Sequence, residues 1–241
     1  MRKTNDLGRD PVFRLVCRLA IPTMLAQLVS VLYSIVDRIY IGNIQGIGDL
    51  ALAGVGVCGP IVTLLSSFAS LVGLGGSPIM AMRMGEGRDR EAGRVLSNSF
   101  LMLLILSGVL TTLFLLLKEH LLMWFGASPV TFPYANAYIT IYLMGTVFAL
   151  LSSGLNQFIV CQGFANAAMR SVLLGAVLNI ALDPVFIFLL DMGVRGAALA
   201  TVLSQMASCA YVLLFLFGRR PPVRITFGGY RLKTVRSVLT V

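Results

Sequence analysis

Long stretches without charge constrain this chain more than any other feature. A helix needs about 20 mainly apolar residues to cross the hydrocarbon core of a bilayer. Six stretches of this kind alternate with charged or turn-forming segments, at approximately residues 19–41, 51–82, 95–117, 134–160, 168–190 and 196–218. The second is overlong, which indicates a tilted or partly interfacial helix, and Pro129 and Pro133 break the apolar run before the fourth. The sequence therefore predicts an all-α integral membrane protein with six transmembrane helices.

The composition argues against a soluble enzyme. Apolar residues make up 57% of the chain and charged residues 12%, against roughly 45–50% and about 25% in soluble domains. The single histidine, His120, is expected in a connecting loop, without a catalytic arrangement around it. The four cysteines lie far apart, which argues against a disulfide framework or a transition-metal site. We therefore expect no enzymatic activity and no cofactor.

The basic residues lie mostly on one side of the expected membrane. Most of the 19 Lys and Arg residues fall in the N-terminal segment, in the connections after the second and fourth spans, and beyond the sixth span, whereas the opposite connections hold Lys118 and Arg195. By the positive-inside rule both termini face the cytoplasm. The N-terminal segment lacks a cleavage pattern for a signal peptide. We expect a multi-pass protein of the plasma (inner) membrane, with lipid and not nucleic acid around it.

The chain divides into a helical part and a basic tail. Residues 1–218 are expected to form a six-helix lobe. Residues 219–241 contain Pro-Pro and Gly-Gly pairs and then a basic stretch from Tyr230 to Thr240. This pattern is typical of a cytoplasmic linker that enters an amphipathic surface helix and leads towards a second lobe, which is missing here. The alternative is a simple basic tail on the anionic inner leaflet.

Three charged residues lie within the expected spans: Asp37, Arg38 and Asp183. Such residues are costly in a bilayer unless they face a cavity or a partner, so each is a functional candidate. At 1.5 Å per residue, Asp37 lies roughly 7 Å and Asp183 roughly 10 Å from the outer ends of their helices. The two carboxylates are therefore expected at similar depth.

Further oxygen ligands are expected beside Asp183. Asn179 precedes it by four residues and so shares its helix face, and Pro184 leaves the Ile180 carbonyl without a donor. Thr201 lies roughly 7.5 Å from the outer end of the last span, in the same layer. Carboxylate, amide and carbonyl oxygens are the ligands of hard cations, so sodium is a candidate ligand, and so is a proton.

A structural interpretation of these residues remains open. Asp37 would then pair with Arg38, Asn179 and Asp183 would bond neighbouring helices, and Thr201 would bond its own backbone. Adjacent residues on a helix do not face each other, however, and Arg38 can extend to the outer headgroups. This favours a separate environment for Asp37.

Two other features have two interpretations each. The fourth span carries a polar face with two tyrosines nearer the outside. This face either lines a substrate path or forms hydrogen bonds with neighbouring helices. Its residues are Ser152, Ser153, Asn156, Gln157, Tyr138 and Tyr142. The second span is rich in glycine, which allows either close helix packing or a deformable helix around a cavity.

Several motifs resemble those of the multidrug and toxic compound extrusion (MATE) family. The fifth and sixth spans carry LNIALDPVFI at 178–187 and MGVRGAALATVLSQ at 192–205, and the first carries VDRIYIG at 36–42. Ala20-Ile-Pro22 and Leu52-Ala-Gly-Val55 are also similar to the family's first helix and the start of its second. Gln162-Gly163 fits, but residues 164–168 depart from the family pattern.

The resemblance implies export of small organic, often cationic, compounds in exchange for sodium or protons, by alternating access between two six-helix lobes. It implies a cation site in the N-terminal lobe at Asp37, Asn179, Asp183 and Thr201, with Tyr138 near it. The family has twelve helices, so six spans correspond to one lobe, and the C-terminal lobe or a second copy is the expected partner. The alternatives are a flippase for a lipid-linked substrate and a truncated membrane protein without transport activity.

Overall fold

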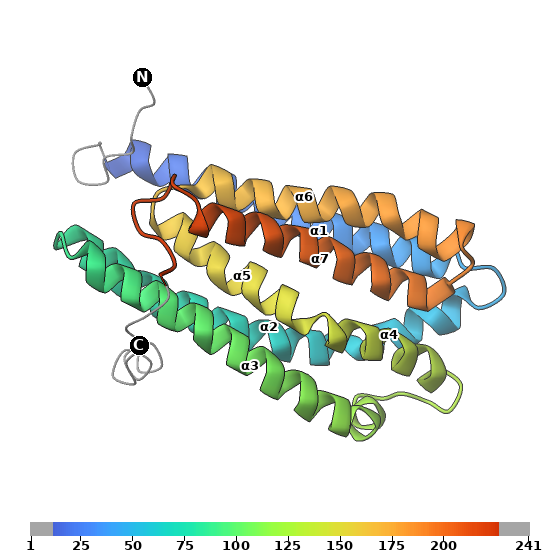
Figure 1. Cartoon of the computed structure of the whole chain (residues 1–241). Coiled ribbons are helices and arrows are strands. Elements are labelled where there is room, and N and C mark those ends of the chain that lie inside the picture. Colours follow the sequence, from blue (N-terminus) through green and yellow to red (C-terminus); the bar gives the residue numbers. More distant parts are fainter. Residues whose placement is uncertain (1–11, 227–241) are drawn as a thin grey trace.

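The computed structural model describes residues 12–226, and the regular elements in that range are helices (Figure 1). They are α1 (Val12–Gly42), α2 (Gly48–Gly85), α3 (Asp89–Trp124), α4 (Phe132–Met144), α5 (Thr146–Cys161), α6 (Ala165–Pro184), the π-helical turn η1 (Val185–Leu189) and α7 (Gly193–Phe217). Five of the helical segments are long and apolar enough to cross a membrane, and α4 with α5 makes a sixth if the pair is one span. The all-α membrane fold is thus as predicted, with five or six candidate spans.

The helix α3 extends well beyond the predicted stretch 95–117, whereas α2 exceeds the predicted stretch 51–82 only slightly at each end. The helices α2 and α3 contain 38 and 36 residues, so α2 is roughly 57 Å long, against about 30 Å for a bilayer core. The start of α3 lies in a charged segment, where Asp89 and Glu91 stabilise the positive end of the helix dipole. Hydropathy marks only the part of a helix that lipid or protein surrounds, which is why the predicted boundaries are short.

The predicted fourth span, 134–160, is broken at Gly145. The helices α4 and α5 meet there at an angle of 59°. A β-carbon at Gly145 would lie 2.5 Å from Val202 Cγ2, so α7 packs directly against the break. The bend is therefore tied to a close approach that only glycine permits at this position.

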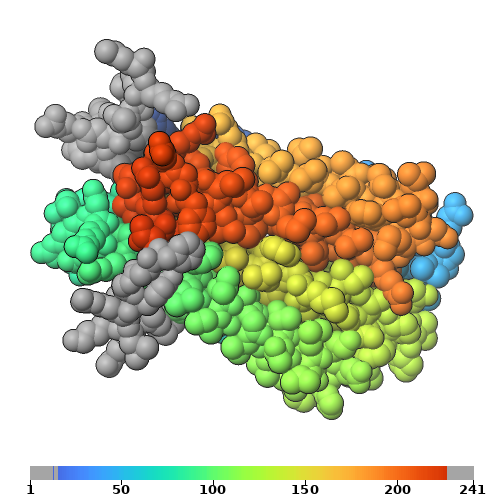
Figure 2. Space-filling model, in the orientation of Figure 1, coloured from blue at the N-terminus to red at the C-terminus, as the bar shows by residue number. Residues whose placement is uncertain are grey.

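Two groups of helices build the bundle. In one, α1 packs along α6, and α6 packs against α7; in the other, α2 packs against α3, α4 and α5, and α7 joins the groups through α4 and α5 (Figure 1). Figure 2 shows α6 and α7 along one edge of the elongated body and α3 along the other. On α1 only Pro22 and Ile41 are buried among the side chains described, so this helix lies at the periphery.

Glycines allow α2 to approach its neighbours closely. Gly54, Gly73 and Gly76 are buried, and a β-carbon at Gly73 would lie 2.9 Å from the Gly154 carbonyl oxygen of α5. Gly56 and Gly59, by contrast, have nothing within 4 Å of that position. Close packing therefore explains the first three glycines and leaves the other two without a packing role.

The basic segment after α7 folds back onto the bundle as far as residue 226. Pro221, Val223 and Ile225 are buried, and the Thr226 backbone N–H donates to Ser97 Oγ at 3.0 Å. The predicted surface helix from Tyr230 to Thr240 and the first basic residues of the chain lie outside the described residues.

Candidate functional site

Three helices bring the four predicted cation-site residues together. The Asn179 Nδ2 group on α6 donates to Asp183 Oδ1 at 3.3 Å and to Thr201 Oγ1 of α7 at 3.5 Å. The Asp37 carboxyl group of α1 lies close enough to the Asp183 carboxyl group for the two to interact electrostatically. We call Asp37, Asn179, Asp183 and Thr201 the acidic cluster. The side chains that were expected at similar depth are thus close together in the structure.

The acidic cluster is largely buried and short of donors. Asp183 is 0% and Asn179 1% exposed. Asp37 Oδ1, Asn179 Oδ1 and Asp183 Oδ2 are buried and have no hydrogen-bond partner within the part of the protein that the structure describes. Two carboxyl groups so close in a low-dielectric environment repel each other when both are charged. Three buried acceptors without donors and two adjacent carboxyl groups therefore fit a bound cation or proton.

Local helix geometry explains how the cluster forms. The positions of Asn179 and Asp183, four apart, place both on the face of α6 that meets α1 and α7. The Thr201 hydroxyl donates to the Ala197 carbonyl of its own helix at 3.0 Å, which leaves its oxygen available to accept from Asn179. Pro184 ends α6 and the chain continues as the π-helical turn η1, a wider turn that often accompanies functional sites. Arg38 is exposed, as expected for a side chain that extends to the membrane surface.

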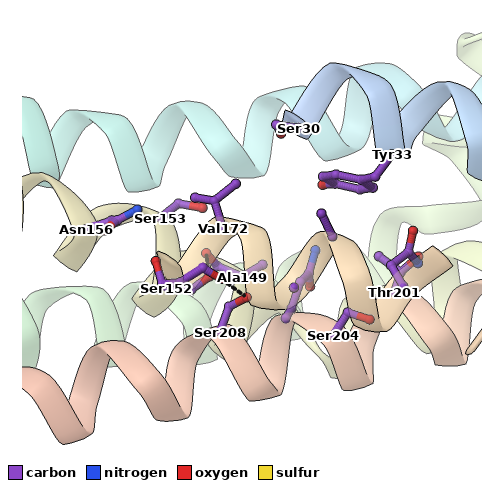
Figure 3. A pocket seen from close by; sticks show the side chains of 15 residues that line it. Ser30, Tyr33, Ala149, Ser152, Ser153, Asn156, Val172, Thr201, Ser204 and Ser208 are labelled. Atoms are coloured by element: carbon purple, nitrogen blue, oxygen red, sulfur yellow. Dashed lines mark hydrogen bonds between the residues drawn. The ribbon is translucent and has the colours of Figure 1, made fainter. Parts of the chain in front are cut away.

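A polar cavity of about 150 Å³ adjoins the acidic cluster. Asn179 and Thr201 belong to both, and the cavity continues between α1, α5, α6 and α7 (Figure 3). Three of its lining residues, Ser152, Ser153 and Asn156, are on the predicted polar face of the fourth span. The volume is below the roughly 300–1,000 Å³ of pockets that hold drug-sized ligands, so in this conformation the cavity suits water or a small ion.

The other residues of the predicted polar face lie outside the lining of this cavity. Gln157 is exposed on α5 and its aliphatic part lies beside Gly73 of α2. Tyr138 and Tyr142 are buried on α4 with their rings stacked, 6.2 Å between centroids. Gln205 Nε2 donates to the Tyr142 hydroxyl at 3.4 Å, and the Tyr138 hydroxyl lies in hydrogen-bonding range of Thr201. Tyr138 therefore borders the acidic cluster, and Tyr142 bonds across helices.

The sequence interpretation missed much of the cavity lining. Ser30 and Tyr33 reach the cavity from α1, while Ser204 and Ser208 reach it from α7 (Figure 3). The Ser208 hydroxyl donates to the Ser171 carbonyl of α6 at 2.9 Å. A signal was present, because the polar residues 201, 204, 205 and 208 follow the helical spacing that places side chains on one face. Residues 30, 33, 34 and 37 of α1 follow the same spacing.

Together, a bundle of apolar helices, a buried acidic cluster and an adjoining polar cavity define the class of multi-pass membrane transporters. A family model described as MatE matches residues 22–185. The chain belongs to the MATE family of multidrug efflux transporters.

Relatives of this family are similar over most of the chain. The multidrug export protein MepA of Staphylococcus saprophyticus is 29% identical over 210 residues, which is 86% of this chain and 46% of MepA. MepA of Staphylococcus haemolyticus is 27% identical over 209 residues, 87% of this chain and 46% of that protein. The chain therefore spans about half the length of the curated relatives it matches.

Solved structures of transporters are also similar to this chain. The crystal structure of MATE in the bent conformation has a TM-score of 0.88 and 31% identity, covering 95% of this chain and 51% of that one. A transporter of the MOP superfamily from Pyrococcus furiosus, described as having a binding pocket of reverse polarity, has a TM-score of 0.88 and 31% identity, covering 95% of this chain and 50% of its own. The similarity to these transporters covers nearly the whole chain and about half of each of them.

Proposed function

We propose that this chain is the N-terminal lobe of a cation-coupled antiporter that exports small organic, often cationic, compounds by alternating access. Its Asp37 and Asp183 would bind the coupling ion, sodium or a proton, with Asn179 and Thr201 as further ligands. The observation that carries the proposal is the group of buried oxygens without donors in the acidic cluster. Binding of a positive ion would supply what these oxygens lack.

The coupling follows from the energetics of buried charge. Without the ion, two adjacent carboxylates favour a conformation that admits water to α1, α6 and α7, because water stabilises both charges. With the ion, the charges are compensated and the helices can pack tightly around a dry site. An ion that binds one conformation better than another shifts the equilibrium between them by the difference in binding free energy.

The exported compound requires a larger site than the polar cavity. At about 150 Å³ that cavity is too small for a drug-sized molecule. An exposed apolar face on α1 indicates where the lobe meets lipid or another lobe, through Met24, Leu28, Val31 and Ile35. We place the compound between this lobe and its partner, either the C-terminal lobe or a second copy.

The orientation belongs to the same proposal. The α2–α3 connection, the start of α6 and the segment after α7 lie at one end of the bundle (Figure 1), and each of them contains arginine. This end would face the cytoplasm of a plasma (inner) membrane, in accordance with the positive-inside rule.

The experiment is an efflux assay of the variant Asp183→Asn. The coding DNA is read past the Val241 codon and the complete product is expressed in a drug-sensitive bacterium. The variant is expected to abolish ion-driven export of a cationic dye such as ethidium, because a neutral amide carries no charge that a bound cation or proton could compensate. Asp191→Asn is the matched control, since Asp191 is exposed in the turn before α7 and asparagine accepts its φ of 51°. Unchanged drug resistance of Asp183→Asn at equal expression would refute the proposal.

A further inference from the structure

A second, larger hollow lies at the other end of α1, α6 and α7. It has a volume of about 970 Å³ and is lined by five arginines, from α1, from the first turns of α6 and from the segment after α7: Arg18, Arg170, Arg219, Arg220 and Arg224. We call it the arginine hollow. Neither the acidic cluster nor the polar cavity includes any of these residues.

The charged side chains that line the arginine hollow, among the residues that the structure describes, are arginines. Among its lining residues that the structure describes, none is Asp or Glu. Two arginines at the α2–α3 connection are paired with carboxylates. Arg83 forms ion pairs with Glu86 and Glu91, and Arg88 pairs with Glu86. Arg170, Arg219, Arg220 and Arg224 therefore give the hollow a positive potential. A cleft of one sign attracts the opposite charge.

Hydrogen bonds to Gln162 and Leu216 hold the backbone of the last segment in place. The Val223 backbone N–H donates to Gln162 Oε1 at 3.1 Å, and Val223 is 2% exposed. The Ile225 N–H donates to the Leu216 carbonyl at 3.3 Å. A segment fixed at these points presents Arg219, Arg220 and Arg224 without first being ordered, which lowers the free-energy cost of binding a ligand.

Part of the wall of the hollow is aromatic. Phe164 and Phe215 pack edge to face with ring centroids 5.4 Å apart, and Tyr211 lies in the same lining. Tyrosine is enriched where a membrane protein meets the headgroup layer. A ligand that fits both the arginines and these rings has an anionic group beside an apolar portion, which favours a phospholipid over a free phosphate.

We propose that the arginine hollow binds the headgroup phosphate of an anionic phospholipid from the surrounding bilayer. Arginine forms forked hydrogen bonds with phosphate oxygens, and basic pockets between membrane helices bind such headgroups. The volume admits a headgroup with two phosphates, such as that of cardiolipin. The proposal is independent of the exported compound and of the coupling ion.

The test is a lipid titration of the full chain, purified in detergent, by native mass spectrometry. Cardiolipin, phosphatidylglycerol and phosphatidylcholine are compared for wild type and for the double variant Arg219→Gln/Arg220→Gln. One arginine near the surface changes affinity for anionic lipid about fivefold, so the double variant is expected to bind cardiolipin about 25-fold more weakly. Phosphatidylcholine should bind weakly to both proteins.

The matched control is Arg88→Gln/Arg90→Gln. It removes the same charge from two exposed neighbours at the same end, outside the hollow, and should change cardiolipin affinity less than twofold. Equal loss in both double variants, or equal binding of cardiolipin and phosphatidylcholine by wild type, would overturn the proposal. So would displacement of cardiolipin by inorganic phosphate at millimolar concentration, which would assign the hollow to a free anion.

Discussion

The acidic cluster and the arginine hollow are built by the same three helices at opposite ends, and they differ in how far their charged groups are buried. In the acidic cluster, Asp183 is fully buried and two carboxyl groups face each other. In the arginine hollow, Arg170, Arg219 and Arg220 are exposed and keep their contact with water. An uncompensated buried charge costs several kcal/mol, whereas an exposed one costs little.

This difference predicts different ligands. A buried cluster of oxygens excludes a bulky partner and depends on a small ion or a proton, so its occupancy should change the packing of the helices around it. A wide, wet hollow accepts a large anion without changing the bundle. We therefore expect the cluster to control conformation and the hollow to tie the same helices to the membrane surface.

The largest effect is expected from Asp37→Asn. A ligand at 100 times its dissociation constant stabilises a protein by about 2.7 kcal/mol, and this ion-dependent stabilisation should vanish in the variant. The measurement is thermal unfolding of the purified chain, in sodium chloride against choline chloride and at pH 8 against pH 6. Wild type should respond to sodium or to pH, which identifies the coupling ion.

The control for Asp37→Asn is Asp49→Asn, an exposed aspartate in the first turn of α2. It should keep the wild-type response. If Asp37→Asn also keeps it, the acidic cluster does not bind the ion, and its buried oxygens require another explanation.

A smaller effect is expected from Asn179→Ala. The amide group donates to both Asp183 and Thr201, and a hydrogen bond to a charged group is worth about 1.5–3 kcal/mol. The variant should bind the coupling ion about 10- to 100-fold more weakly, as measured by the ion concentration at half-maximal stabilisation. Asn166→Ala, on the exposed first turn of α6, is the control with the same substitution on the same helix. Equal ion affinities of the two variants would show that Asn179 is no ligand.

The composition of the acidic cluster was predictable from sequence because it depends on local geometry. Helix rise fixes depth, and a spacing of four fixes the face, so Asp37, Asn179, Asp183 and Thr201 could be assigned to one layer. The family resemblance selected the same residues. The polar stripe of α7 at 201, 204, 205 and 208 obeys the same rule and could have been found in the same way.

Other features depend on contacts between distant segments and were not predictable. The break at Gly145 is linked to its contact with Val202 of α7. The arginine hollow exists because Gln162 and Ser97 anchor the segment after α7, whereas the charge pattern alone suggested a linker or a tail. Hydropathy also gave the spans without the polar ends of α2 and α3, because a helix continues wherever its backbone bonds are satisfied.

The smallest expected effect is that of salt concentration on ligand affinity, and it distinguishes the acidic cluster from the arginine hollow most directly. The Debye length falls from about 10 Å at 0.1 M to about 3 Å at 1 M. Exposed arginines are screened by mobile ions, and buried carboxyl groups are not. Raising choline chloride from 0.1 to 1 M should weaken cardiolipin binding about tenfold and change the affinity of the acidic cluster for its coupling ion less than twofold.

Lipid binding that resists salt would mean that the aromatic wall around Phe164 and Phe215 holds the lipid. An equal loss at both ends would mean that the acidic cluster is open to solvent, and the distinction between a dry and a wet end would fail.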